Sequence, residues 1–124
     1  MKIAFFIDEY LPSVHGVATS TTTYKEALEK LGHEVYIIAP HVDGYEDFDD
    51  HIIRMPSSKS YVFEKREMAN IYPGLAKKLD DYHFDIVHSQ TQFFLGILAH
   101  SVAKRQNIPH VTTIHTLFTE LIDD

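Results

Sequence analysis

Apolar residues gather in four short runs that show no polar alternation. The first covers residues 3–7, and the others lie within the segments HEVYIIAP, FDIVHS and IPHVTTIH, at residues 33–40, 84–89 and 108–115. A strand with one solvent-facing side alternates apolar and polar positions, whereas a strand covered on both faces does not. These runs therefore predict buried strands, and the shorter segment HIIRMP, residues 51–56, predicts one more extended piece.

Between these runs, apolar residues return at helical spacing. One series ends where Gly32 is placed to cap a helix, and a second ends near Asn107. A short third helix is predicted over residues 75–82, after the Pro73-Gly74 pair. The two longer series consist of Val17, Thr21, Tyr24, Leu28 and Leu31, and of Phe94, Leu95, Leu98 and Val102.

Strands that alternate with helices over short loops predict crossover connections and a parallel sheet. We therefore predict an α/β fold, a Rossmann-like open parallel sheet in the strand order 3-2-1-4-5, with helices on both faces. A length of 124 residues fits a single domain of this kind.

Charge and cysteine content narrow the function classes. The net charge is −7, whereas a nucleic-acid-binding protein needs a basic surface. The charge therefore argues against nucleic acid as a partner. The chain has no cysteine, and its first apolar run is too short to span a membrane. Together these features favour a cytoplasmic protein.

Residues 57–78 depart from the acidic average. They hold five basic residues against two acidic ones, interleaved with aromatic and aliphatic side chains. Such a composition fits a surface that lies on an anionic membrane, in this case the inner face of the cell membrane. It also fits a solvated face over ordinary core positions, and the sequence leaves both interpretations open.

Polar residues directly follow three of the apolar runs. In open parallel sheets, ligands bind beyond the carboxyl ends of the strands, so these residues form the candidate site. Asp8 can accept a proton from an acceptor hydroxyl, or cap the following turn through its backbone N–H groups; both roles stay open. The residues concerned are Asp8 and Glu9; His88, Ser89 and Gln90; and His115 and Thr116.

The loop after the first run contains one glycine, Gly16. A dinucleotide fingerprint needs several closely spaced glycines and a P-loop needs a lysine, and the stretch IDEYLPSVHGVATS has neither. A glycine at a helix start lets a ligand approach the backbone N–H groups and the positive end of the helix dipole. Gly16 equally suits a left-handed turn, so both interpretations remain open.

Two histidine pairs invite a metal interpretation: His83 with His88, and His110 with His115. A strand separates the members of each pair and places them on opposite faces, so we predict no metal site.

Four segments, in order and spacing, resemble the N-terminal domain of family 4 retaining glycosyltransferases. They are DEYLPSVHGVATS, ALEKLGHEVYIIAP, FDIVHSQTQFFLG and IPHVTTIHTLFTE, and they extend over essentially the whole chain. The similarity is above all to bacterial diacylglycerol glucosyltransferases. It implies the GT-B architecture, in which catalysis takes place between two Rossmann-like domains. Residues 1–124 would be the acceptor-side domain in truncated form, and the C-terminal donor-binding domain would lie outside this sequence.

The resemblance also implies roles for single residues. Gly16 and Val17 would border the donor diphosphate and the transferred sugar, and His115 would face the donor sugar. Asp8 joins His115 as a candidate catalytic residue, and Thr116 and Glu120 are candidate contacts to the acceptor.

The implied reaction moves a hexose from a nucleotide-sugar such as UDP-glucose to a lipid or other hydroxyl, without a metal or other cofactor. The isolated chain is expected to be inactive, because the resemblance assigns the main grip on the diphosphate to the other domain. Apolar surface uncovered in such a fragment would favour self-association. A non-catalytic flavodoxin-like binding or regulatory module shares the fold and remains the alternative.

Overall fold

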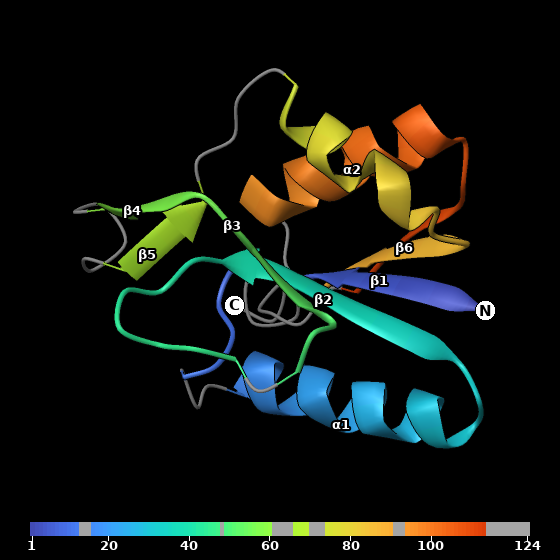
Figure 1. Cartoon of the computed structure of the whole chain (residues 1–124), viewed down its shortest axis with the longest axis horizontal. Coiled ribbons are helices and arrows are strands. Elements are labelled where there is room, and N and C mark those ends of the chain that lie inside the picture. Colours follow the sequence, from blue (N-terminus) through green and yellow to red (C-terminus); the bar gives the residue numbers. More distant parts are fainter. Residues whose placement is uncertain (13–15, 48, 61–65, 70–73, 91–93, 114–124) are drawn as a thin grey trace, which may run out of the picture.

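A computed structural model describes residues 1–12, 16–47, 49–60, 66–69, 74–90 and 94–113. Its main sheet has five parallel strands in the order β3-β2-β1-β6-β7 (Figure 1). Their bounds are Lys2–Phe6 for β1, Glu34–Pro40 for β2, Ile52–Met55 for β3, Ile86–Ser89 for β6 and His110–Thr112 for β7. When only the five strands of this sheet are counted along the chain, their order in the sheet is 3-2-1-4-5. The predicted fold class and strand order are therefore confirmed.

Helices cover both faces of the sheet (Figure 1). Helix α1 (Gly16–Lys30) lies against one face, whereas α2 (Phe94–Gln106) and the 3-10 helix η1 (Leu75–Tyr82) cover the other. Helix α1 is followed by a left-handed glycine, Gly32 with φ +93°, as the sequence predicts. Helix α2 is followed by Asn107 with φ 55°, and asparagine also tolerates this conformation.

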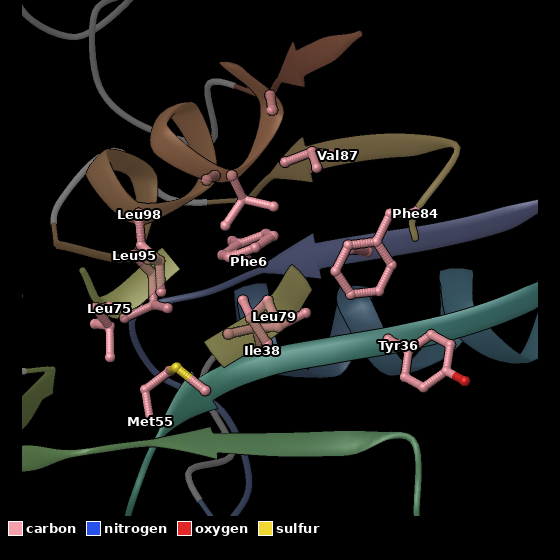
Figure 2. Close-up of a cluster of buried hydrophobic side chains, with 14 residues drawn as sticks. Phe6, Tyr36, Ile38, Met55, Leu75, Leu79, Phe84, Val87, Leu95 and Leu98 are labelled. Carbon is pink, nitrogen blue, oxygen red and sulfur yellow. The ribbon is translucent and has the colours of Figure 1, made fainter. Parts of the chain in front are cut away.

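Two buried clusters explain why the first apolar run shows no alternation, whereas β7, which was predicted to be buried, has Val111 42% exposed. Ile3, Phe5 and Ile7 belong to the cluster on the α1 side of the sheet. Ala4 and Phe6 belong to the cluster on the other side, where side chains of α2 and η1 meet those of β1 and β2 (Figure 2). Each fully buried large apolar side chain contributes about 1.5–3 kcal/mol relative to an exposed one. Successive positions of β1 thus serve opposite cores, and the first apolar run needs no polar position.

The inner face of α1 differs from the predicted one. Tyr24 and Leu31 are 54% and 75% exposed, whereas Lys25, which is not part of the predicted series, is 5% exposed; Thr21 is 0% exposed, as predicted. Both buried polar groups are satisfied. The Thr21 hydroxyl donates to the carbonyl of Val17 at 2.8 Å, and the Lys25 ammonium pairs with two carboxylates. The predicted series is therefore right at Thr21, wrong at Tyr24 and Leu31, and lacks Lys25.

Strands β4 (Ser57–Ser60) and β5 (Arg66–Ala69) form a separate two-stranded antiparallel sheet. The hydrophobic pattern does not predict this hairpin, because its short strands are rich in serine and charged residues and lack a clear period. The hairpin falls inside the basic and aromatic segment 57–78. Within the described ranges, we find no helix with the length and apolar character needed to cross a membrane.

Candidate functional site

Buried polar side chains gather at the carboxyl edge of the sheet. Asp8, which follows β1, is 4% exposed, and Ser89 and Gln90, at the end of β6, are each 1% exposed. Among the described residues, the only other buried polar or charged side chains are Thr21 and Lys25. Because burying polar groups is costly unless they are satisfied, their concentration at this edge singles it out as the candidate site.

Backbone hydrogen bonds hold this edge in place beyond the ends of the strands. The N–H of Gln90 donates to the carbonyl of Phe6 at 2.8 Å, and the N–H of Thr113 donates to the carbonyl of Ser89 at 2.9 Å. The ends of β1, β6 and β7 are thus linked to one another directly.

Asp8 caps a helix. Its Oδ1 accepts a hydrogen bond from the backbone N–H of Leu95 at 2.8 Å. Leu95 is the second residue of α2, so its N–H is among the groups that have no partner within the helix. The carboxylate also meets the positive end of the helix dipole. A capping role is therefore observed, although on α2 rather than on the turn that directly follows Asp8. The role of Asp8 as a proton acceptor stays a prediction.

Gly16 is the first residue of α1 and is exposed. Its φ is not positive, and a Cβ added to it would meet no atom of the described residues within 4 Å. The left-handed-turn interpretation of Gly16 is therefore wrong, and the folded backbone does not require a glycine here. Val17 is half-buried and packs against the core cluster on the α1 side, so it can offer a ligand its backbone rather than its side chain.

Two pairs of a histidine and a hydroxyl residue join β6 to β7. His88 Nε2 is hydrogen-bonded to the Thr113 hydroxyl, and His110 Nε2 to the Ser89 hydroxyl. The sequence analysis placed His88 and Ser89 in the candidate site and considered His110 only as a possible metal ligand, and it missed both pairs. The signal lies in the strand register, which places each observed partner two residues from the directly opposite position and hence on the same face.

A pocket of about 430 Å³ opens beside the second pair, between α2 and β7. The centroids of the His100 and His110 rings lie 6.1 Å apart there. Burial, and then the charge of His100, lower the pKa of His110 below its ordinary value of 6.5, so the ring is neutral at neutral pH. The described ranges contain no group of three or more His, Asp or Glu side chains arranged to hold a metal ion. The pocket is lined by Ser89, Gly96, Ile97, His100, Ser101, His110 and Thr112.

Sequence reasoning also missed Arg54, at the carboxyl end of β3. Its side chain is 13% exposed and pairs with Asp47, from the acidic loop between β2 and β3. A single arginine in a short extended run belongs to no motif, so only the position of its partner could have drawn attention to it.

Three predicted site residues, His115, Thr116 and Glu120, lie outside the described residues. Their roles stay predictions. The structure thus brings Asp8 to the edge of the sheet and Gly16 and Val17 to the start of α1.

Residues 14–123 match the family model described as Glycosyltransferase Family 4. The chain is 41% identical to an alpha-monoglucosyldiacylglycerol synthase of Streptococcus pneumoniae and 37% identical to one of Acholeplasma laidlawii. These similarities cover 98% and 97% of the chain, which spans 28% and 31% of the length of these two relatives.

In fold, the chain is similar to the crystal structure of MurG from Acinetobacter baumannii. The TM-score is 0.61, and the similarity covers 98% of this chain and 38% of MurG at 11% sequence identity. At that identity the likeness shows the fold alone, whereas the family match extends over most of the sequence. The chain belongs to Glycosyltransferase Family 4.

Proposed function

We propose that the chain is the N-terminal, acceptor-side domain of a retaining glycosyltransferase that moves a hexose from a nucleotide-sugar to a lipid or other acceptor hydroxyl. Family membership supports sugar transfer. The names of the two relatives, both monoglucosyldiacylglycerol synthases, support a glucosyl donor and a diacylglycerol acceptor. The same findings favour an enzyme domain over a flavodoxin-like binding module, which would share only the fold.

The observation that carries the proposal is the open start of α1 near the buried polar edge. Among the described residues, no atom lies within 4 Å of a Cβ built on Gly16, so this part of the chain leaves room for a ligand to come close to the backbone there. The first N–H groups of a helix have no partner within it, and the positive end of the dipole favours an anion. We assign Gly16 and the backbone of Val17 to the donor diphosphate and the transferred sugar. A second domain would supply the main grip on the diphosphate.

In the proposed reaction, the bond between C1 of the hexose and the diphosphate oxygen breaks as the acceptor oxygen bonds to C1 from the same face. The acceptor proton passes to the leaving phosphate, so the reaction needs no protein nucleophile. His115 is proposed to stabilise the charge that develops on the sugar, and Thr116 and Glu120 to contact the acceptor. Asp8 is retained as the second candidate catalytic residue, and no metal or other cofactor is assigned.

A diacylglycerol acceptor requires contact with a membrane surface. We assign that contact to residues 57–78, because their basic side chains favour anionic headgroups and their aromatic side chains favour the interface. This places the proposed enzyme at the inner face of the cell membrane. Self-association of the isolated domain stays a prediction.

The test is a transfer assay on the complete protein that contains this chain. UDP-glucose, UDP-galactose and GDP-mannose are offered in turn with diacylglycerol in anionic vesicles, and the lipid product is identified. We expect transfer of an α-linked hexose, and a His115→Ala variant that remains folded but is slower by about 100-fold or more. Absence of transfer from every donor in the unsubstituted protein contradicts the proposal.

A further inference from the structure

Arg54 joins three segments at the carboxyl edge of the sheet. Its Nε and Nη2 donate to the two carboxylate oxygens of Asp47, at 2.9 and 2.8 Å. Nη1 donates to the carbonyl of Pro40 at 2.9 Å, and Nη2 also donates to the carbonyl of Leu11 at 2.6 Å. Because Arg54 lies in β3, Pro40 ends β2 and Leu11 lies in the loop after β1, one guanidinium holds all three.

The charge of Arg54 is neutralised within this cluster. The side chains of Arg54 and Asp47 are 13% and 12% exposed. The rings of Tyr10 and Tyr45 flank the guanidinium, with centroids 5.8 and 5.4 Å from its central carbon. The four hydrogen bonds use most of the N–H donors of the side chain. A guanidinium engaged in this way is suited to fixing protein segments rather than to gripping a phosphate itself.

Tyr10 extends the connection to α1. It is 4% exposed, and its hydroxyl lies 2.8 Å from the hydroxyl of Thr22, a residue of α1. Arg54 therefore contacts two described residues that precede Gly16 in the chain. The contacts are to the carbonyl of Leu11 and to the ring of Tyr10, whose hydroxyl end is bonded to the helix that Gly16 begins.

We propose that Arg54, together with Asp47, is a positioning residue for the sugar donor. The pair sets where the loop after β1 and the start of α1 lie, and thereby where Gly16 meets the nucleotide-sugar. This inference rests on the proposed function. A displacement of about 1 Å in a positioning group can lower the rate roughly 100-fold, so loss of the Arg54 contacts should have a measurable effect. Lysine cannot replace Arg54, because one ammonium cannot form the fork with Asp47 and also reach both carbonyls.

Arg105 provides a matched control. Its Nε and Nη2 form the same two-bond fork with Asp80, at 2.6 and 2.7 Å. This pair joins α2 to η1 next to Asp85, which precedes β6, and so lies at the amino end of the sheet. Its side chains are 41% and 39% exposed. Loss of this fork leaves the start of α1 untouched.

The experiment compares Arg54→Lys, Asp47→Asn and Arg105→Lys in the complete protein, at a temperature where thermal denaturation shows each variant to be folded. We measure the KM for UDP-glucose, the KM for the acceptor, and backbone amide exchange of residues 9–11 and 16–22 without substrates. We expect Arg54→Lys and Asp47→Asn to raise the donor KM about tenfold or more, to leave the acceptor KM unchanged and to speed exchange. Arg105→Lys should change none of these. If Arg54→Lys does not fold, Asp47→Asn carries the test, since asparagine keeps one oxygen acceptor for the guanidinium.

Several results would overturn the inference. One is an unchanged donor KM in the folded variants, even if exchange is faster. Another is an equal rise in both KM values, which indicates general loosening. A rise in Arg54→Lys but not in Asp47→Asn indicates direct contact of Arg54 with the donor. If the unsubstituted protein transfers no sugar, the proposed function itself fails and the role of Arg54 fails with it, whereas an active protein with unaffected variants rejects this inference alone.

Discussion

At Gly16, a methyl group can be added without a steric cost within the described part of the chain, because φ is not positive and no atom there lies within 4 Å of the new carbon. Alanine is also the better helix former and restricts the unfolded chain. We expect Gly16→Ala to leave the free energy of unfolding unchanged or to raise it by up to about 1 kcal/mol. In the complete protein, the same methyl group would occupy the space assigned to the donor, and the donor KM should rise at least about tenfold.

Chemical denaturation and steady-state kinetics check the two halves of this prediction separately. A Gly16→Ala variant with unchanged donor KM and kcat would show that no ligand approaches the start of α1. A large loss of stability would show that the helix start differs from the observed one.

Two substitutions at Asp8 separate its two roles. Asp8→Ala removes the cap of α2 and should lower the free energy of unfolding by about 1–2 kcal/mol. Asp8→Asn keeps an oxygen for the N–H of Leu95, so it should cost less, mainly the interaction of the charge with the helix dipole. If capping is the main role, kcat of Asp8→Asn stays within about tenfold of the unsubstituted value. A folded Asp8→Asn enzyme that is slower by about 100-fold or more would instead establish Asp8 as a base.

At the scale of elements, α1 is tied to the loop before β3 by a buried lysine. The Lys25 ammonium lies 2.6 Å from Asp49 and 2.9 Å from Glu29, and the Lys25 side chain is 7% exposed. Burial acts most strongly on the pKa of Asp49 and raises it. The hydrogen bonds from Lys25 and the His51 N–H outweigh burial, so the pKa lies below its ordinary 3.8. Burial likewise lowers the pKa of Lys25, yet its bonds to Asp49 and Glu29 leave it above the ordinary 10.5.

The signs of these shifts fix the pH dependence of stability. The contribution of Asp49 is complete above pH 3.8 and is lost as the pH falls below that value. The contribution of Lys25 is complete below pH 10.5 and is lost as the pH rises above it. We therefore expect Lys25→Met to reduce the difference in unfolding free energy between pH 7 and about pH 2.5, as measured by urea denaturation. An identical pH difference in both proteins would show that the pair does not stabilise the fold.

Elements with a continuous apolar run or a clear hydrophobic period could be predicted from the sequence, and elements held by polar contacts could not. The runs at residues 3–7 and 84–89 form neighbouring parallel strands, as expected; the first is buried on both faces, and the second is buried at Val87 and Ser89. The β4–β5 hairpin has no such period. Arg54 and the pairs that join β6 to β7 depend on residues far apart in the chain. The edge of the sheet that carries the site was therefore predictable, whereas the network that shapes it was not.

At the scale of the whole molecule, each face of the sheet has its own buried cluster within the described residues. We therefore expect the 124-residue chain to fold without further domains. We expect the chain by itself to transfer no sugar, because an enzyme with its site between two domains must hold both reactants in one geometry. That positioning can supply roughly 7–11 kcal/mol of the barrier. In this account, the chain contributes one wall of the cleft and the start of α1.

Isothermal titration with UDP-glucose tests this central claim most directly, on the isolated chain and on the complete protein in parallel. Circular dichroism first establishes that the isolated chain is folded. We predict that the complete protein binds the nucleotide-sugar and that the isolated chain binds it at least about 100-fold more weakly. The reason is that the proposed second domain supplies most of the contacts to the diphosphate. Micromolar binding by the isolated, folded chain would show that this domain carries the donor site by itself, and would contradict the account.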